Sequence, residues 1–155
     1  MADYYSADIS FPEKYNTKSL EQMIKGDMED EDGMEVSTED GIINYSGMAR
    51  YSEFETAENF MRHHKIPFTR FVDTDHEGDA YYIHYRPGYE DRQIVTNDKG
   101  EYIIPAKDIR EVVNDLLDDK LSYADTVERL TKLLEVNTDG KLPSLKSYIE
   151  KQEAS

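Results

Sequence analysis

The sequence contains no cysteine, which excludes disulfide bonds, thiolate metal ligands and a cysteine nucleophile. It also has no long hydrophobic run, because no stretch approaches the roughly 18 apolar residues that indicate a membrane span. The first residues, MADYYSADISF, have neither a basic start nor an apolar core, so they are not expected to act as a signal peptide. These absences predict a soluble, cytoplasmic protein that does not enter a membrane.

Catalytic motifs are missing as well. The single glycines form neither a phosphate-binding loop nor a dinucleotide fingerprint, and no serine lies in a G-x-S-x-G frame. Paired carboxylates decide nothing in a chain with 34 acidic residues. The sequence therefore favours a non-enzymatic protein without a cofactor.

Basic residues are scarce relative to acidic ones. The chain has 18 Lys and Arg against 34 Asp and Glu, a formal net charge of −16, and residues 1–40 hold twelve of the acids but only three of the bases. Such a charge repels nucleic acid and anionic lipid and attracts basic surfaces. We expect no direct binding to nucleic acid or membrane, and a basic protein as partner.

Hydrophobic periodicity predicts an α+β fold: an antiparallel sheet with helices packed on one face, followed by a C-terminal segment of two to three helices. Predicted strands are 4–11, 41–51, 68–74, 80–85, 93–97 and 101–105, and predicted helices begin near 17, 53, 106, 123 and 144. Residues 1–105 would form one domain with an acidic loop at 27–40, and residues 106–155 would dock on it, because about fifty residues rarely sustain their own core.

Local signals refine the helices. Ser52 with Glu55 and Ser122 with Asp125 match the pattern in which two side chains cap a helix N-terminus. The helix from 106 carries an apolar stripe of Ile109, Val112, Val113, Leu116 and Leu117, and the next helix carries Tyr123, Val127, Leu130 and Leu134, expected to face inward.

The heptad DTDHEGD at 73–79 matches the start of a calcium-binding loop, with acids at alternate positions and Gly78 for the bend. The twelfth position, which should be a bidentate Glu, is His84, and strands rather than helices flank the heptad. A hairpin turn between two aromatic strands explains the composition better. The acids of the turn remain candidates for contact with a partner.

Two further groups of side chains are candidates. Tyr82 and Tyr89 beside Arg86 could anchor an interface, since Tyr and Arg are enriched in binding hot spots. His76 and His84, with nearby acids such as Asp73 and Asp79, could hold zinc in a metal-dependent enzyme, but no H-x₃-H or H-E-x-x-H spacing supports this alternative, and no metal site is assigned.

In small size, lack of cysteine, strong acidity and absence of a catalytic motif, the chain resembles the inhibitors that phages and plasmids carry against host restriction or CRISPR nucleases, several of which mimic DNA. This resemblance implies a partner such as a host nuclease or DNA-binding complex, and the host cytoplasm as the compartment. Acids at 27–40, 73–79, Glu90–Asp91 and Asp115, Asp118 and Asp119 could line up on one side of the molecule and take the place of phosphates. An immunity protein or antitoxin that blocks a toxin's basic cleft is an alternative.

The partner-binding hypothesis rests on carboxylates that could pair with Lys and Arg, together with two tyrosines. The predicted residues are Asp27, Glu29, Asp30, Glu31, Asp32, Asp73, Asp75, Glu77, Asp79, Tyr82 and Tyr89. Exposed strand edges leave both a monomer and a dimer open.

Overall fold

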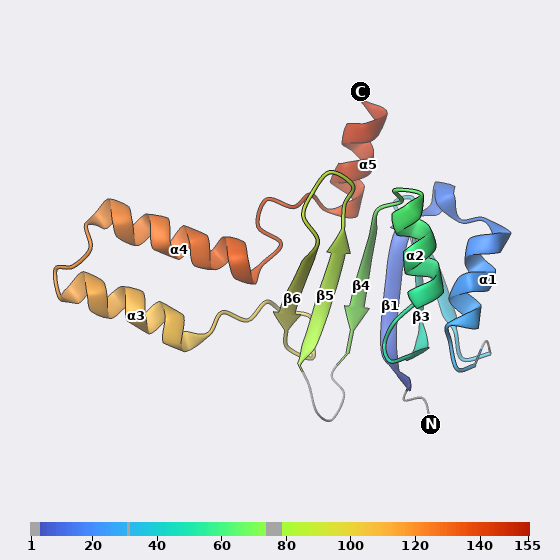
Figure 1. Cartoon of the computed structure of the whole chain (residues 1–155), viewed down its shortest axis with the longest axis horizontal. Coiled ribbons are helices and arrows are strands. Elements are labelled where there is room, and N and C mark those ends of the chain that lie inside the picture. Colours follow the sequence, from blue (N-terminus) through green and yellow to red (C-terminus); the bar gives the residue numbers. More distant parts are fainter. Residues whose placement is uncertain (1–3, 31, 74–78) are drawn as a thin grey trace.

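The computed structural model describes residues 4–30, 32–73 and 79–155. A six-stranded antiparallel sheet forms its centre, with the strand order β2-β3-β1-β4-β5-β6 (Figure 1). The strands are β1 (Tyr4–Pro12), β2 (Glu35–Glu39), β3 (Ile42–Arg50), β4 (Phe68–Val72), β5 (Ala80–Tyr85) and β6 (Arg92–Thr96). The predicted α+β class is confirmed.

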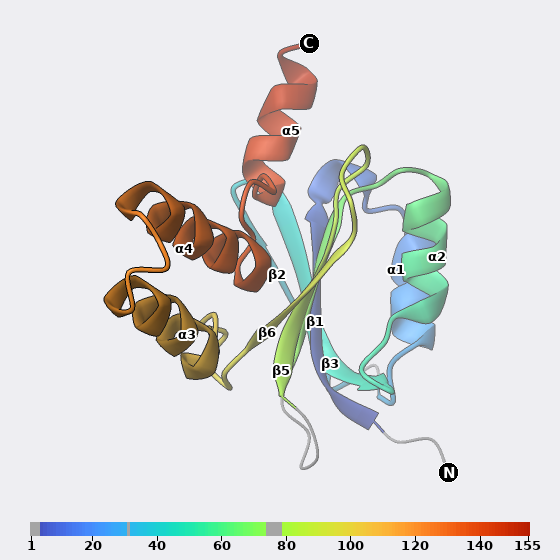
Figure 2. The same ribbon diagram turned by 60° about the vertical axis from the view of Figure 1, so that its left-hand side comes forward.

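Two helices, α1 (Lys18–Gly26) and α2 (Glu55–His63), lie together on one face of this sheet (Figures 1 and 2). Side chains alternate between the faces of a strand, so every second residue of the central strands points at the helices. The resulting core is formed by Ala7, Ile9, Phe11, Leu20, Ile24, Ile43, Tyr45, Ala57, Met61 and Phe68, with their neighbours. Burial of this apolar face is what holds the two layers together.

The C-terminal helices do not form one layer. They are α3 (Ala106–Leu117), α4 (Tyr123–Asn137) and α5 (Leu145–Glu153). A short 3-10 turn, η1 (Glu13–Tyr15), lies between β1 and α1. Helices α3 and α4 form a hairpin that projects beyond the β6 edge, whereas α5 returns to the sheet and contacts β1 (Figures 1 and 2). Within the described ranges, no helix combines the length and apolar composition needed to cross a bilayer.

Two arginines attach this C-terminal part to the sheet. Arg86 is almost fully buried and donates to the backbone oxygens of Phe68 (2.6 Å) and Pro143 (3.0 Å). Burial lowers the pKa of Arg86 to about 10. Arg92 on β6 donates to the carbonyl oxygens of Glu135 and Asp139, at and beyond the last turn of α4. A guanidinium suits this position because those carbonyls lack partners within the helix and carry the negative end of its dipole.

The predictions of a loop at 27–40 and of a strand at 101–105 were wrong. Residues 27–40, expected to be a loop, contain β2, which pairs with β3 from Glu35 opposite Ser46 to Glu39 opposite Ile42. All five residues of this edge strand are exposed, so the sequence lacks the apolar alternation that would reveal it. The strand expected at 101–105 reduces to a single bridge between Tyr102 and Thr96.

One of the two predicted caps was also wrong. Ser122 and Asp125 do cap α4 reciprocally, as expected. Ser52, however, lies outside α2, is buried and has a φ of 59°, and the N-cap residue Phe54 has no side-chain cap. Two of the first-turn N–H groups of α2, those of Thr56 and Ala57, are instead satisfied by Asp27, which lies directly after α1.

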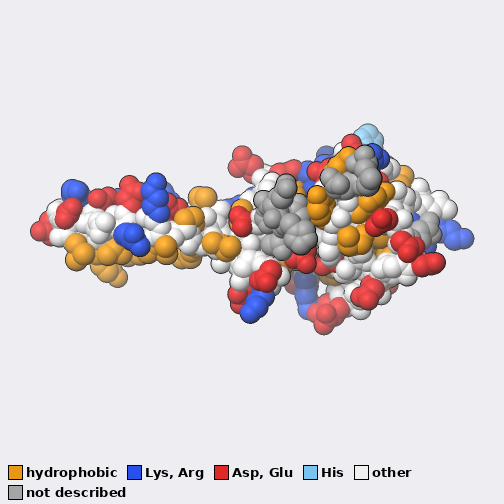
Figure 3. All heavy atoms as spheres, turned by 90° about the horizontal axis from the view of Figure 1, so that it is seen from below, with side chains coloured by type: hydrophobic (Ala, Val, Ile, Leu, Met, Phe, Trp, Pro, Cys, Tyr) orange, Lys and Arg blue, Asp and Glu red, His pale blue; other side chains and the backbone are white. Residues whose placement is uncertain are grey.

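The expected burial of the C-terminal apolar stripes was wrong for most of their residues. Val112 is buried, but eight others remain 37–83% exposed and line one long edge of the hairpin, opposite an edge of charged side chains (Figure 3). We call these eight the apolar hairpin face: Ile109, Val113, Leu116, Leu117, Tyr123, Val127, Leu130 and Leu134. Periodicity correctly identified the face but could not show that the hairpin projects away from the sheet.

Candidate interaction site

Three loops meet at one end of the sheet. Tyr4, the first residue of β1, pairs with Arg50, the last of β3, and Val72 at the end of β4 pairs with Tyr81 at the start of β5. The backbone N–H of Arg50 donates to Asp27 at 3.1 Å, which brings the segment after α1 to the same end. This end is the lower one in Figure 1, and Figure 3 shows it directly.

Acidic side chains are concentrated there. We define the acidic end by its described acids: Glu29, Asp30, Asp32, Glu53, Glu55, Asp73 and Asp79. Figure 3 shows acidic side chains across this end of the sheet. Arg50 lies among them, with its guanidinium 5.5 Å from the ring centre of Tyr51. Like charges gathered on one surface create a negative potential that draws cationic partners.

Two hollows open at the acidic end, on either side of Tyr51. The first, of about 210 Å³, is lined by Tyr5, Tyr51, Ser52, Val72, Asp73, Asp79 and Tyr81. The second, of about 450 Å³, is lined by Tyr4, Gly26, Asp27, Arg50, Tyr51, Glu53, Glu55 and Thr56. The predicted acids Asp73 and Asp79 thus share one hollow with three tyrosine rings.

The turn that carries Tyr51 has an unfavourable backbone. Tyr51 and Ser52 have φ values of 53° and 59°, in the left-handed region that costs a residue with a side chain roughly 1–2 kcal/mol. Two consecutive residues of this kind persist only where surrounding contacts hold them, and such positions are common at functional sites.

A buried ion pair supplies that support. Arg70 on β4 donates to the backbone oxygen of Ser52, and its Nε lies 2.6 Å from Glu58 Oε1 on α2. Burial raises the pKa of Glu58, and the charge of Arg70 opposes that rise. Glu58 also accepts the N–H of Phe54 at 3.4 Å, so both members of the pair bind the turn between β3 and α2.

The chemistry of the first hollow suits an organic cation. Tyrosine faces attract ammonium and guanidinium groups, and the carboxylates of Asp73 and Asp79 can pair with the same charge. The structure adds Tyr51, Glu53 and Glu55 to the residues that sequence reasoning proposed, and only their place in one charged segment, RYSEFE, hinted at them.

Asp27 has a different role from the other predicted acids. Its Oδ2 accepts the N–H of Thr56 at 3.0 Å and that of Ala57 at 3.2 Å, and its Oδ1 accepts the Thr56 hydroxyl at 2.9 Å. The carboxylate is therefore already bound to the N-terminus of α2.

The two predicted tyrosines lie away from the acidic end. Tyr82 is half-buried on the sheet face opposite α1 and α2, where it packs against Phe71 and Tyr102. Burial raises its pKa. Tyr89 follows the far end of β5 and packs edge-on against Tyr148. Arg86, expected beside them at the surface, is an internal anchor of the chain.

Part of the proposed site falls outside the described residues: Glu31, Asp75, Glu77 and His76, and with them most of the calcium-loop pattern. Within the described part, no group of three His, Asp or Glu side chains could hold a metal ion. The described residues therefore contain no metal-binding cluster that would support the alternative of a metal-dependent enzyme using His76 and His84.

His84 is instead an internal residue of the sheet. Its Nδ1 lies 3.0 Å from Thr69 Oγ1, which itself accepts from Arg86 Nη2 at 2.9 Å. The direction of the bond between Thr69 and His84 depends on the ring tautomer, and His84 Nε2 is buried without a hydrogen-bond partner among the described residues. Burial, followed by the charge of Arg86, lowers the pKa of His84 to about 4, so the ring is neutral at pH 7.

The remaining acidic clusters do not join the acidic end. Asp91 pairs with Arg62, near the C-terminus of α2. On the hairpin, Asp115 pairs with Arg129 at 2.7 Å and Asp118 with Lys120 at 3.0 Å. These acids therefore lie outside the compact patch of the acidic end.

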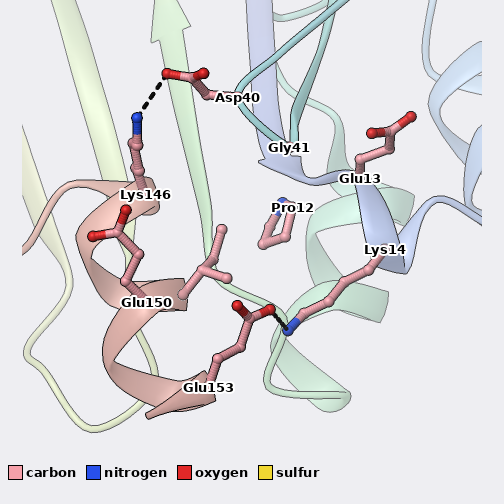
Figure 4. A pocket seen from close by; sticks show the side chains of 9 residues that line it. Pro12, Glu13, Lys14, Asp40, Gly41, Lys146, Glu150 and Glu153 are labelled. Carbon is pink, nitrogen blue, oxygen red and sulfur yellow. Dashed lines mark hydrogen bonds and ion pairs between the residues drawn. The ribbon is translucent and has the colours of Figure 1, made fainter.

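A hollow of about 500 Å³ lies between α5 and the end of β1. Figure 4 shows ion pairs on two sides of it, Lys146 with Asp40 at 2.8 Å and Lys14 with Glu153 at 3.3 Å. Because these pairs are exposed, each contributes little to stability. The hollow marks the seam along which α5 contacts the sheet domain, and none of the predicted site residues lines it.

Comparison with known proteins gives no relative: no family model matches the chain, and neither a curated protein nor a solved structure is significantly similar to it.

Proposed function

We propose that this chain is a non-enzymatic binding protein whose acidic end occupies a basic, nucleic-acid-binding surface of another protein. The observation that supports this most is the convergence of described acids from three segments, 27–32, 53–55 and the pair Asp73 and Asp79, near two hollows lined in part by tyrosines. Surfaces that bind nucleic acid carry rows of Lys and Arg to match the phosphates. A compact group of carboxylates can pair with several of those cations at once.

The hollow of Tyr51, Asp73 and Asp79 adds specificity to this attraction. A Lys or Arg side chain of the partner would enter it, stack on the rings and pair with the carboxylates. Charge alone raises the association rate, whereas a shaped pocket for one cation fixes the register of the complex. The resemblance to inhibitors of restriction and CRISPR nucleases makes such nucleases the first partners to test.

The site is tested with a fluorescent oligoarginine peptide, titrated at low and moderate salt. Asp73→Asn/Asp79→Asn should weaken binding at least roughly tenfold, which corresponds to about 1.4 kcal/mol. The matched control, Asp108→Asn/Glu150→Gln, removes the same charge from α3 and α5 and should change the affinity less than about twofold. If both double variants weaken binding equally, only net charge acts and the acidic end is not the site.

The partner class is tested by affinity capture from a lysate with salt-step elution, repeated with the Asp73→Asn/Asp79→Asn variant. Nucleic-acid-binding proteins that elute steeply with salt, are lost from the variant and are displaced by duplex DNA support the proposal. The proposal is contradicted if the same proteins are captured by the variant and are not displaced by duplex DNA.

A further inference from the structure

Among the described residues, no other element covers the apolar hairpin face. Helices α3 and α4 contact each other much more than any other described element, and Arg92 joins the end of α4 to the sheet. Val112 and Thr126 are the buried residues of the two helices. Two helices with so small a shared interior cannot bury their apolar stripes against one another alone, so this face remains in water.

The exposed apolar surface has the size of a specific interface. The eight side chains of the apolar hairpin face together expose roughly 700 Å², close to the about 800 Å² that each partner buries in a standard protein–protein interface. Monomeric proteins seldom expose apolar patches this large, and such patches mark interaction sites.

We propose that the apolar hairpin face binds the same face of a second copy of this chain, so that two α3–α4 hairpins form an intermolecular four-helix bundle. Each hairpin supplies two of the four apolar stripes that such a bundle needs, with helices about 18 and 22 Å long. A face that is apolar throughout is complementary to itself under a two-fold axis.

The charge distribution also fits a second copy. A chain with a net charge of −16 repels itself wherever acids face acids. The hairpin reduces this repulsion, because charged side chains gather on the edge opposite the apolar hairpin face (Figure 3) and several of them form ion pairs. Arg129 pairs with Asp115 at 2.7 Å and Lys132 with Glu128 at 2.8 Å. The acidic end belongs to the sheet, which leaves it free in the dimer.

Sedimentation equilibrium of the full chain tests the proposal. We expect a dimer with a dissociation constant of about 10 μM or tighter. Val127→Glu, in the middle of the apolar hairpin face, should raise that constant at least about tenfold. Val36→Glu is the matched control: it makes the same change on β2 at similar exposure, 49% against 45%, and should leave the dimer intact.

Cross-linking provides a readout that does not depend on a charged substitution. Because the chain has no cysteine, Leu130→Cys introduces a single thiol, and a bismaleimide should link two copies through it, whereas Val36→Cys should remain largely unlinked. A single-chain mass at every concentration up to about 1 mM would overturn the proposal and assign the face to a different protein. A dimer that survives Val127→Glu with the fold intact, or an assembly that keeps growing with concentration, would overturn it too.

Discussion

Asp27 and Thr56 are joined through both carboxylate oxygens of Asp27, which accept the backbone N–H and the hydroxyl of Thr56 at 3.0 and 2.9 Å. An acid that directly follows α1 thereby caps α2 and ties together the two helices that cover the sheet. The carboxylate also opposes the positive end of the α2 dipole. Asp27 therefore has a structural task, in contrast to its exposed neighbour Glu29.

Replacement of Asp27 by alanine should therefore destabilise the fold, whereas its acidic neighbours should tolerate the same change. We expect Asp27→Ala to lower the free energy of unfolding by about 1–2 kcal/mol, the usual cost of a lost N-cap. Glu29→Ala should change it by less than about 0.5 kcal/mol. Urea denaturation with an unchanged slope measures both. Equal effects of the two substitutions would show that Asp27 does not act as a cap.

The buried ion pair of Arg70 and Glu58 predicts that removal of Arg70 strongly destabilises the fold, by an amount that depends on pH. Arg70→Met leaves the Glu58 carboxylate buried without its partner and should cost about 3–5 kcal/mol at pH 7. The pKa of Glu58 is already raised by burial, so the folded protein takes up a proton at Glu58 more readily than the unfolded chain does. The stability that protonation of Glu58 contributes is present at pH values below the pKa of Glu58 in the unfolded chain. It is lost as the pH rises through the pKa of Glu58 in the folded protein.

Thermal and urea unfolding of Arg70→Met at several pH values test this reasoning. The variant should be closer to the wild type at acidic pH than at pH 7. The double variant Arg70→Met/Glu58→Leu should recover at least about half of the loss at pH 7, because no buried charge remains. A double variant as unstable as the single one would contradict it.

His84 predicts a loss of stability in mild acid. Its pKa falls from 6.5 to about 4 on folding, so the unfolded chain binds more protons between these values. The contribution is complete above pH 6.5 and disappears as the pH falls to about 4, by up to about 3 kcal/mol. His84→Gln should therefore give a flatter dependence of unfolding free energy on pH across this window. An unchanged slope would place the responsible titration elsewhere.

Replacement of Tyr51 by glycine should raise the stability of the fold but weaken binding at the acidic end. Tyr51→Gly removes a side chain from a left-handed backbone position and should stabilise the fold by about 1 kcal/mol. It also removes the ring shared by both hollows, so oligoarginine binding should weaken several-fold. Urea unfolding and the peptide titration, run on the same preparation, check both signs. Stability gained without any loss of binding would remove Tyr51 from the site.

Part of this fold could be predicted because local signals agreed with the tertiary result. The strand-forming residues of YYSADISF, followed by Pro12, predicted β1, and the capping pair of Ser122 and Asp125 predicted the start of α4. β2 could not be found in this way, since an exposed edge strand depends on its pairing with β3 rather than on its own apolar pattern. The capping of α2 was missed because its partner lies 29 residues away in the sequence.

For the candidate site, the sequence selected the right kind of residue and, in part, the right positions. Asp73 and Asp79 lie with the 27–32 segment at one end because antiparallel pairing brings the ends of β3 and β4 together. The same sheet separates the two predicted tyrosines from these acids. Tyr82 lies on the sheet face opposite α1 and α2, and Tyr89 lies beyond the opposite end of β5.

The amino-acid sequence by itself determined the surplus of negative charge, the absence of thiol chemistry and the amphipathic stripes of α3 and α4. These are properties of composition and spacing, which no arrangement in space can alter. Only the tertiary structure decided which acids gather around Tyr51, that Asp27 is bound to a helix, and that the hairpin stripes face water. Each of these depends on contacts between segments distant in the chain, and such contacts leave no pattern in the sequence around either partner.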